Sequence, residues 1–141
     1  PRFNDTLVTR FVNNLMLDGK KSIAFNIFYD AIDIVSEKSE GNGLETWKEA
    51  LNNVMPHVEV RSRRVGGANF QIPMQVRPDR KVTLGMKWMI LATRKRNERS
   101  MAQKLAAEIL AASKEEGAAV KKRTEVHRMA EANKAFSHFR F

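Results

Sequence analysis

The hydrophobic pattern along the chain changes from a helical period to an alternating one in a single stretch, residues 57–81. Short runs rich in β-branched and aromatic residues flank Gly66-Gly67 there, which is typical of a β-hairpin. Because side chains alternate between the two faces of a strand, the parity of the apolar positions predicts the register. Those positions are all even-numbered: Val58, Val60, Phe70, Ile72, Met74 and Val76.

Only an odd-length loop pairs even-numbered residues with even-numbered residues. We therefore expect a three-residue loop over residues 66–68, in which a glycine adopts the left-handed conformation. The predicted pairs are Val58–Val76, Val60–Met74 and Ser62–Ile72, with Arg61, Arg63 and Arg77 on the other, solvent-facing side. A two-residue turn would instead give the pairs Val58–Gln75, Val60–Pro73 and Arg61–Ile72. That register spreads the apolar residues over both faces, so we expect the longer loop.

Apolar residues recur at spacings of three and four on both sides of the hairpin, which predicts helices. The expected helices span about residues 7–16, 23–35, 44–54, 78–96, 100–117 and 120–136. Asp5 or Thr6 and Ser100 are suited to N-caps, and Pro56 ends the third helix. Positions expected to face the core include Ile23, Trp47, Leu91, Met129, and either Phe136 or Phe139. The predicted fold class is mainly α, a single domain over residues 1–141 of six helices, with a protruding two-stranded antiparallel hairpin at about 58–77 between the third and fourth helices.

The charge of the chain narrows the class of its partner. Among 141 residues, 25 are Lys or Arg and 16 are Asp or Glu, for a formal net charge of +9. A folded protein of this charge indicates an anionic partner, which can be nucleic acid, an anionic membrane surface or an acidic protein. The chain has no cysteine, so disulfides and thiolate metal sites are excluded. No apolar run is long enough to span a membrane, and we expect the protein in the cytosol.

The positive charge is distributed unevenly. Residues 30–49 hold six acidic residues and two lysines, whereas residues 61–81 hold six basic residues and one acidic residue. Most of these cations are arginines, whose planar guanidinium suits phosphate, and arginines on one face of a ribbon repel one another unless an anion lies across them. The candidate nucleic-acid-binding residues are Lys20, Lys21, Arg61, Arg63, Arg64, Arg77, Arg80, Lys81, Arg94, Lys95, Arg96, Lys121, Lys122 and Arg123.

Structural alternatives stay open for three groups of these cations. Lys20 and Lys21 can be a solvated corner between two helices, and residues 94–96 complement the helix dipole without any partner. Residues 121–123 can be an ordinary solvated face of the last helix. The terminal residues Phe139-Arg140-Phe141 interleave aromatic rings with a cation, which suits base stacking or docking, or they fray as chain ends do.

Catalytic chemistry has little support in the sequence. The histidines His57, His127 and His138 are scattered, and Glu125 and His127 are two positions apart, which puts them on different sides of a helix. The chain has no glycine-rich loop between a strand and a helix and no nucleophile elbow. We expect no enzyme activity, no metal and no cofactor.

Four stretches carry a resemblance to a known family. They are FVNNLMLDGKKS (11–22), VEVRSRRVGGANFQIPMQVRP (58–78), RKRNERSMAQKLA (94–106) and AAVKKRTEVHRMAEANKAFSHF (118–139). In this order and spacing the chain resembles the bacterial family of protein seven of the small ribosomal subunit, over nearly its whole length. The resemblance implies six helices with a β-ribbon, and a primary binder of the head region of small-subunit ribosomal RNA that nucleates assembly of the head.

The resemblance also implies which residues bind RNA. The family's contacts fall on Lys20 and Lys21, on the basic residues of the ribbon from Arg61 to Lys81, and on residues 94–96. The family's ribbon projects towards the exit-site tRNA and the mRNA, and with the last helix it lies near a neighbouring ribosomal protein of the platform. The family begins with a basic arm, whereas this chain starts at Pro1-Arg2-Phe3, so we expect the ribbon and the helix ends to carry more of the RNA affinity.

Two other classes of binder are weighed against this one. A DNA-bending architectural protein also grips nucleic acid with an arginine-bearing β-ribbon. Such arms work in dimers, and no strongly apolar exposed helix face in this sequence demands a dimer. Pro73 lies in mid-strand and not beside the tip, where a wedge between bases would be useful. A membrane-surface protein needs a helix with bulky apolar residues opposite a cationic face, and the last helix is too rich in alanine.

Overall fold

The computed structural model describes residues 5–139, and the side chains of residues 5–138. Its elements are α1 (Thr6–Leu15), α2 (Lys21–Ser39), α3 (Gly43–Val54), β1 (Val58–Val65), β2 (Ala68–Gln75), α4 (Pro78–Arg94), α5 (Met101–Ser113), α6 (Gly117–Ala132) and the short 3-10 helix η1 (Lys134–Phe139). The mainly α fold is confirmed, with six α-helices and an antiparallel hairpin between the third and the fourth. The predictions for Pro1-Arg2-Phe3 and for the side chains of Phe139, Arg140 and Phe141 lie outside the described residues.

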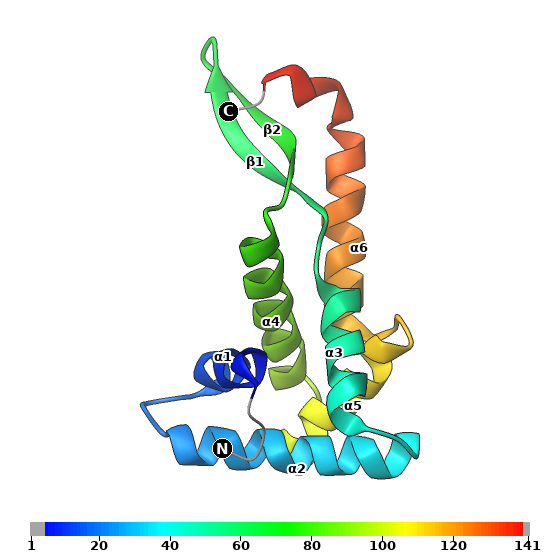
Figure 1. The fold of residues 1–141 in the computed structure, drawn as a ribbon. Coiled ribbons are helices and arrows are strands. Elements are labelled where there is room, and N and C mark those ends of the chain that lie inside the picture. Colours follow the sequence, from blue (N-terminus) through cyan, green and yellow to red (C-terminus); the bar gives the residue numbers. More distant parts are fainter. Residues whose placement is uncertain (1–4, 140–141) are drawn as a thin grey trace.

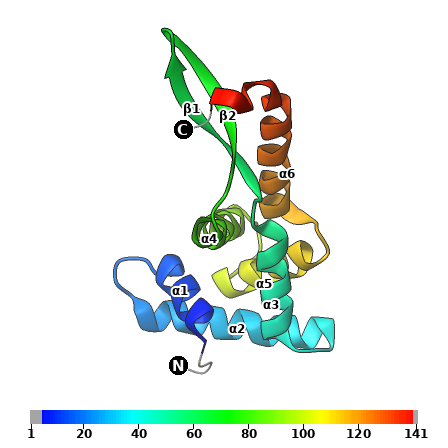
Figure 2. The ribbon, with the colours of Figure 1, turned by 45° about the horizontal axis from the view of Figure 1, so that its top comes forward.

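The helices form a body from which the ribbon projects. Helices α1 to α5 pack together, while β1, β2 and α6 extend away from them on the same side (Figure 1). The chain turns at the end of α6, so that η1 lies against the ribbon (Figure 1). A second view looks nearly along α4, which has α1 on one side and α6 on another (Figure 2). None of the helices among the described residues is long and apolar enough to cross a membrane.

Local side-chain chemistry fixes the starts of the helices. The Asp5 carboxylate accepts from the backbone N–H of Leu7 at 2.9 Å and caps α1. Ser100 caps α5 in a capping box, because its hydroxyl accepts from the N–H of Gln103 while the Gln103 side chain accepts from the N–H of Ser100. Both predicted caps are confirmed. Asn42, which caps α3, was not predicted.

A cluster of aromatic rings from three helices forms the centre of the core. Phe11, Phe28 and Trp47 are fully buried, and their ring centroids lie 5.2 to 5.7 Å apart. Two of the three pairs have edge-to-face geometry, which the ring quadrupole favours. Helix α4 passes close to the end of α3, since a Cβ on Gly85 would lie 2.7 Å from Cγ of Met55. The predicted core position of Trp47 is confirmed.

Three apolar residues that were expected to face the core are exposed instead. They are Ile23 (54% exposed), Leu91 (42%) and Met129 (40%). The buried stripe of α2 begins at Ala24, so Ile23 falls just outside it. The last helix is also shorter than predicted: α6 ends at Ala132, and Phe136 belongs to η1, where it is half-buried.

The predicted three-residue loop of the hairpin is wrong, and so is its register. The strands are joined by the two-residue turn Gly66-Gly67, and the pairs run from Val58–Gln75 to Val65–Ala68. Both glycines have positive φ, 57° and 85°, as a type I′ turn requires. This turn matches the right-handed twist of the strands and keeps every residue of both strands paired, which outweighs the grouping of apolar residues by parity.

The observed register places arginines and apolar residues on the same face of the ribbon. Arg61 pairs with Ile72 and Arg63 with Phe70, and directly paired residues project from the same face. Phe70 packs on Phe136 of η1, with ring centroids 5.0 Å apart. The expectation that Arg61 and Arg63 occupy a separate solvent-facing side is therefore wrong. The expected approach of the ribbon base to the body is confirmed, because Val76 joins the core.

Candidate nucleic-acid interface

The candidate cations fall into two groups according to their partners within the protein. Six have side chains with no hydrogen bond, ion pair or ring contact to any residue between 5 and 139: Lys20, Arg64, Arg77, Arg94, Lys95 and Lys121. The others make contacts within the protein. A cation without an internal partner keeps its full capacity for an external anion, so the first group is the stronger candidate for an interface.

Arg80 is held by a carboxylate at the base of the ribbon. Its Nε and Nη2 donate to the two oxygens of Glu59 at 2.7 and 3.1 Å. The hydrogen bond to Glu59 raises the pKa of the Arg80 guanidinium above its ordinary value. The next residue, Lys81, places Nζ 3.4 Å from Nδ1 of His57. Both cations therefore connect the first turn of α4 to the start of β1.

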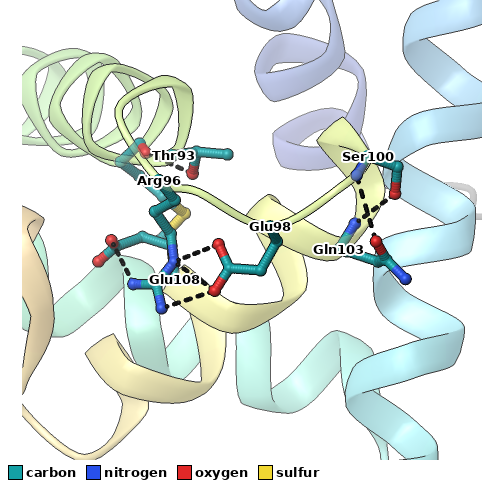
Figure 3. A network of polar contacts seen from close by, with 7 residues as sticks. Thr93, Arg96, Glu98, Ser100, Gln103 and Glu108 are labelled. Atoms are coloured by element: carbon teal, nitrogen blue, oxygen red, sulfur yellow. Dashed lines mark hydrogen bonds and ion pairs between the residues drawn. The ribbon is translucent and has the colours of Figure 1, made fainter.

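Arg96 occupies the centre of a polar network in the turn between α4 and α5 (Figure 3). Its guanidinium donates to both oxygens of Glu98, at 3.0 to 3.3 Å, and to Oε1 of Glu108 at 3.3 Å. Glu108 is fully buried. The hydrogen bond from Arg96 lowers the pKa of the Glu98 carboxyl. Arg96 thus pairs with a buried carboxylate, and its contact with nucleic acid stays a prediction.

Arg123 joins α6 to the end of α3. Its Nη1 donates to the backbone carbonyl of Asn53 at 2.5 Å and lies 3.6 Å from Oε1 of Glu115. The side chain is mostly covered. The two neighbouring lysines differ from it, since Lys121 and Lys122 are exposed and Lys122 lies 5.9 Å above the ring of Trp88.

Three shallow hollows adjoin one another around α4. The first lies between the α1–α2 turn and the end of α4, and Arg94 lines both it and the second hollow, which includes Lys87. Leu91 lines both the second hollow and the third, which α4 forms with α6. The hollows therefore form one continuous surface. We call it the α4 surface and define it by the cations Lys20, Lys87, Arg94, Lys95, Lys121 and Lys122 and the exposed apolar residues Leu17, Ile23 and Leu91.

The α4 surface is strongly cationic. The acidic residues that line its three hollows are Asp18 and Glu125, and Glu125 already pairs with Arg128 at 2.6 Å. Six cations with so little opposing charge repel one another until an anion binds. Phosphates are suited to this role because they bind lysine and arginine through charge-assisted hydrogen bonds and release counterions on binding.

Sequence reasoning missed part of the α4 surface. Lys87 and the exposed positions of Leu17 and Leu91 were not among the candidates. A signal was present, because Lys87, Leu91, Arg94 and Lys95 stand at positions i, i+4, i+7 and i+8, the spacing of one helix face. The expectation that Leu91 faces the core concealed this exposed stripe. No group of metal-ligating side chains large enough to hold a metal ion occurs among residues 5–138.

A basic surface with exposed apolar residues, carried by a helical body with a β-ribbon, is typical of a nucleic-acid-binding protein. A family model described as "Ribosomal protein S7p/S5e" matches residues 1–134. The chain belongs to this family.

Individual relatives match at high identity. Small ribosomal subunit protein uS7 of Flavobacterium psychrophilum is 74% identical over 144 residues, which cover 100% of this chain and 91% of the relative. The protein of the same name from Christiangramia forsetii is 76% identical with the same coverage. That of Clostridium botulinum is 54% identical and covers 100% of this chain and 90% of the relative.

Proposed function

We propose that the protein is a structural constituent of the small ribosomal subunit. It binds ribosomal RNA with the α4 surface and with the outer face of the ribbon, which is the face that carries Arg64 and lies opposite to Phe70. The observation that carries the proposal is the gathering of unpaired cations on one continuous surface. Four of the six cations that lack an internal partner, Lys20, Arg94, Lys95 and Lys121, belong to it. Family membership supports the same partner, because the matching relatives are small-subunit ribosomal proteins.

The ribbon contributes a second contact. Arg64 lies on the face opposite to Phe70, and Arg77 follows β2 as the N-cap of α4. Both side chains are exposed, and neither has a partner among the described residues. The ribbon is long and narrow (Figures 1 and 2), so it can reach nucleic acid that the helical body does not touch. In the assembled subunit we assign this reach to the exit-site tRNA and mRNA path, as the family resemblance implies.

The remaining properties follow from family membership. Ribosomal proteins of this family are structural and not catalytic, their partners are ribosomal RNA and neighbouring ribosomal proteins, and their location is the ribosome in the cytoplasm. We also assign to the protein the nucleation of head assembly, as the family resemblance implies. This role requires that the protein bind RNA early. A cationic surface favours this, since electrostatic attraction raises association rates.

Salt dependence of RNA binding tests the proposal directly. The test variant is Lys95→Gln with Lys121→Gln, and the control is Lys38→Gln with Lys114→Gln, which removes the same charge from exposed lysines outside the α4 surface. Binding to the head region of small-subunit ribosomal RNA is measured between low and moderate salt. The test variant should lower the slope of log affinity against log salt by about 1.4 to 1.8, since each of the two phosphate contacts contributes about 0.7 to 0.9. Equal slopes for the two variants would contradict the proposal.

The DNA-bending alternative is tested by competition. Folded RNA from the small-subunit head should displace duplex DNA from the protein at moderate salt, because non-specific duplex binding weakens steeply with salt while the shaped RNA site retains its further contacts. Equal affinity for both nucleic acids would favour the architectural function.

A further inference from the structure

We propose that the hollow between the α1–α2 turn and the end of α4 holds one unstacked base of the ribosomal RNA. The proposal rests on the proposed function and specifies what this part of the α4 surface binds. The hollow has a volume of about 430 Å³ and is lined by apolar side chains from three helices and a turn, including Leu15, Leu17, Ile23 and Met101. Such a space accepts a planar apolar group.

A hydrogen-bonded turn forms one side of the hollow. Asp18 and Gly19 both have positive φ, 52° and 73°, and the N–H of Lys20 donates to the carbonyl of Leu17 at 3.0 Å. This geometry holds the Leu17 side chain at 63% exposure on the rim of the hollow. Ile23, in the first turns of α2, is also more than half exposed. Exposed apolar residues that gather at one site indicate a binding partner.

The charges around the hollow indicate a nucleotide as that partner. Lys20 and Arg94 line it, and neither side chain has a partner among the described residues. An apolar side chain of a protein would fill the space and leave both cations unpaired. A nucleotide supplies both halves of the match, because its base is planar and largely apolar on its faces while its phosphates are anionic.

Asp18 gives the hollow an orientation. Its carboxylate lines the same space and has no hydrogen bond or ion pair to any described residue. A carboxylate repels phosphate, but it accepts hydrogen bonds from the amino groups of bases. The base edge therefore lies towards Asp18, and the flanking phosphates lie towards Lys20 and Arg94.

An exposed apolar position allows a test that leaves the fold intact. The test variant is Ile23→Gln, and the matched control is Met129→Gln, since Met129 is comparably exposed but lies on α6 outside this hollow. Ile23→Gln should weaken binding to head-region ribosomal RNA about fivefold or more, as the loss of a base contact does, with no change in the salt slope. Lys20→Gln should instead reduce the slope. A result for Ile23→Gln equal to that for Met129→Gln would overturn the inference.

Nucleotide-resolution probing identifies the contact. With wild-type protein, 2′-hydroxyl acylation should show one nucleotide protected that becomes reactive with Ile23→Gln, while the rest of the footprint persists. A photo-crosslinking residue at position 23 in assembled subunits should join to that same nucleotide. Crosslinking to a protein instead would overturn the inference in favour of protein docking. Failure of the wild-type protein to bind the RNA would refute the proposed function itself, so the two failures are distinguishable.

Discussion

The backbone N–H of His57 donates to Nε2 of His127, with the two nitrogens 3.0 Å apart. His57 lies at the entry to the ribbon, where its carbonyl accepts from the N–H of Val76, and its ring stacks on that of His127 with centroids 5.8 Å apart. Nε2 can accept only while it carries no proton. The link between the ribbon and α6 therefore requires neutral His127.

This link predicts a pH dependence of stability. Burial, and then the positive charges of Arg123 and His57, lower the pKa of His127 below its usual value. The unfolded chain then binds the proton more readily than the folded chain. The contribution of His127 to the free energy of unfolding should be fully present above about pH 6.5. It should be lost as the pH drops towards the lowered folded-state pKa.

A variant isolates the contribution of this residue from that of other groups that titrate in the same range. His127→Gln keeps an acceptor for the His57 N–H but cannot be protonated. Denaturant unfolding at pH 7.5 and pH 5.0 should show a smaller loss of stability for His127→Gln than for the wild type. The same loss in both proteins would rule out the hydrogen bond as the source of the pH dependence.

Arg94, the last residue of α4, and Arg96, in the turn that follows, are predicted to have different roles. Arg96→Ala leaves the buried carboxylate of Glu108 without its cation, which should cost about 3 kcal/mol of unfolding free energy. Arg94→Ala removes an exposed side chain with no partner among the described residues, so stability should be unchanged within about 0.5 kcal/mol. Ribosomal RNA affinity should fall for Arg94→Ala.

A double replacement controls for the loss of charge. Arg96→Met with Glu108→Leu removes both the buried charge and its partner, and should restore much of the stability that Arg96→Ala loses. Chemical denaturation measures this recovery. If Arg96→Ala proves as stable as Arg94→Ala, the Arg96 network does not stabilise the α4–α5 turn.

Local sequence rules predicted what depends on neighbours in the chain. The caps at Asp5 and Ser100 and the core position of Trp47 rest on short-range chemistry and helical period, and all three are confirmed. Pairing of the cations could not be predicted in this way. Arg80 pairs with Glu59, which is 21 positions away in the sequence, and Arg96 pairs with Glu108, which is 12 positions away. Only the fold brings these residues together.

The predicted register of the hairpin was wrong for a different reason. The parity argument assumed that one face of the ribbon is apolar and the other charged. In the structure η1 covers the face that carries Phe70 and Arg63, so an aliphatic arginine stem and an aromatic ring can share it. The packing of η1 on the ribbon could not be known from the sequence. The preference of Gly66-Gly67 for a two-residue turn with positive φ was therefore the better guide to the register.

The turn makes its own prediction. Gly66 has φ of 57°, and a Cβ there would meet no atom within 4 Å, so a substitution is limited by backbone conformation alone. Gly66→Asn should be tolerated, because asparagine adopts the left-handed region readily in type I′ turns, whereas Gly66→Val should cost about 1 to 2 kcal/mol. Thermal unfolding of the two variants measures the difference. Equal stability would argue against the two-residue turn.

The two faces of the ribbon should respond differently to charge reversal. Arg64 is exposed on the outer face, opposite Asn69, whereas Arg63 is half-buried beside Phe70, which packs on Phe136. Arg64→Glu should leave the melting temperature nearly unchanged and reduce affinity for ribosomal RNA, because the side chain contributes to phosphate binding only. Arg63→Glu should lower the melting temperature as well, since it places a carboxylate against the aromatic contact. Thermal melts and RNA binding of both variants in parallel test this, and a loss of stability with Arg64→Glu equal to that with Arg63→Glu would contradict the assignment of the faces.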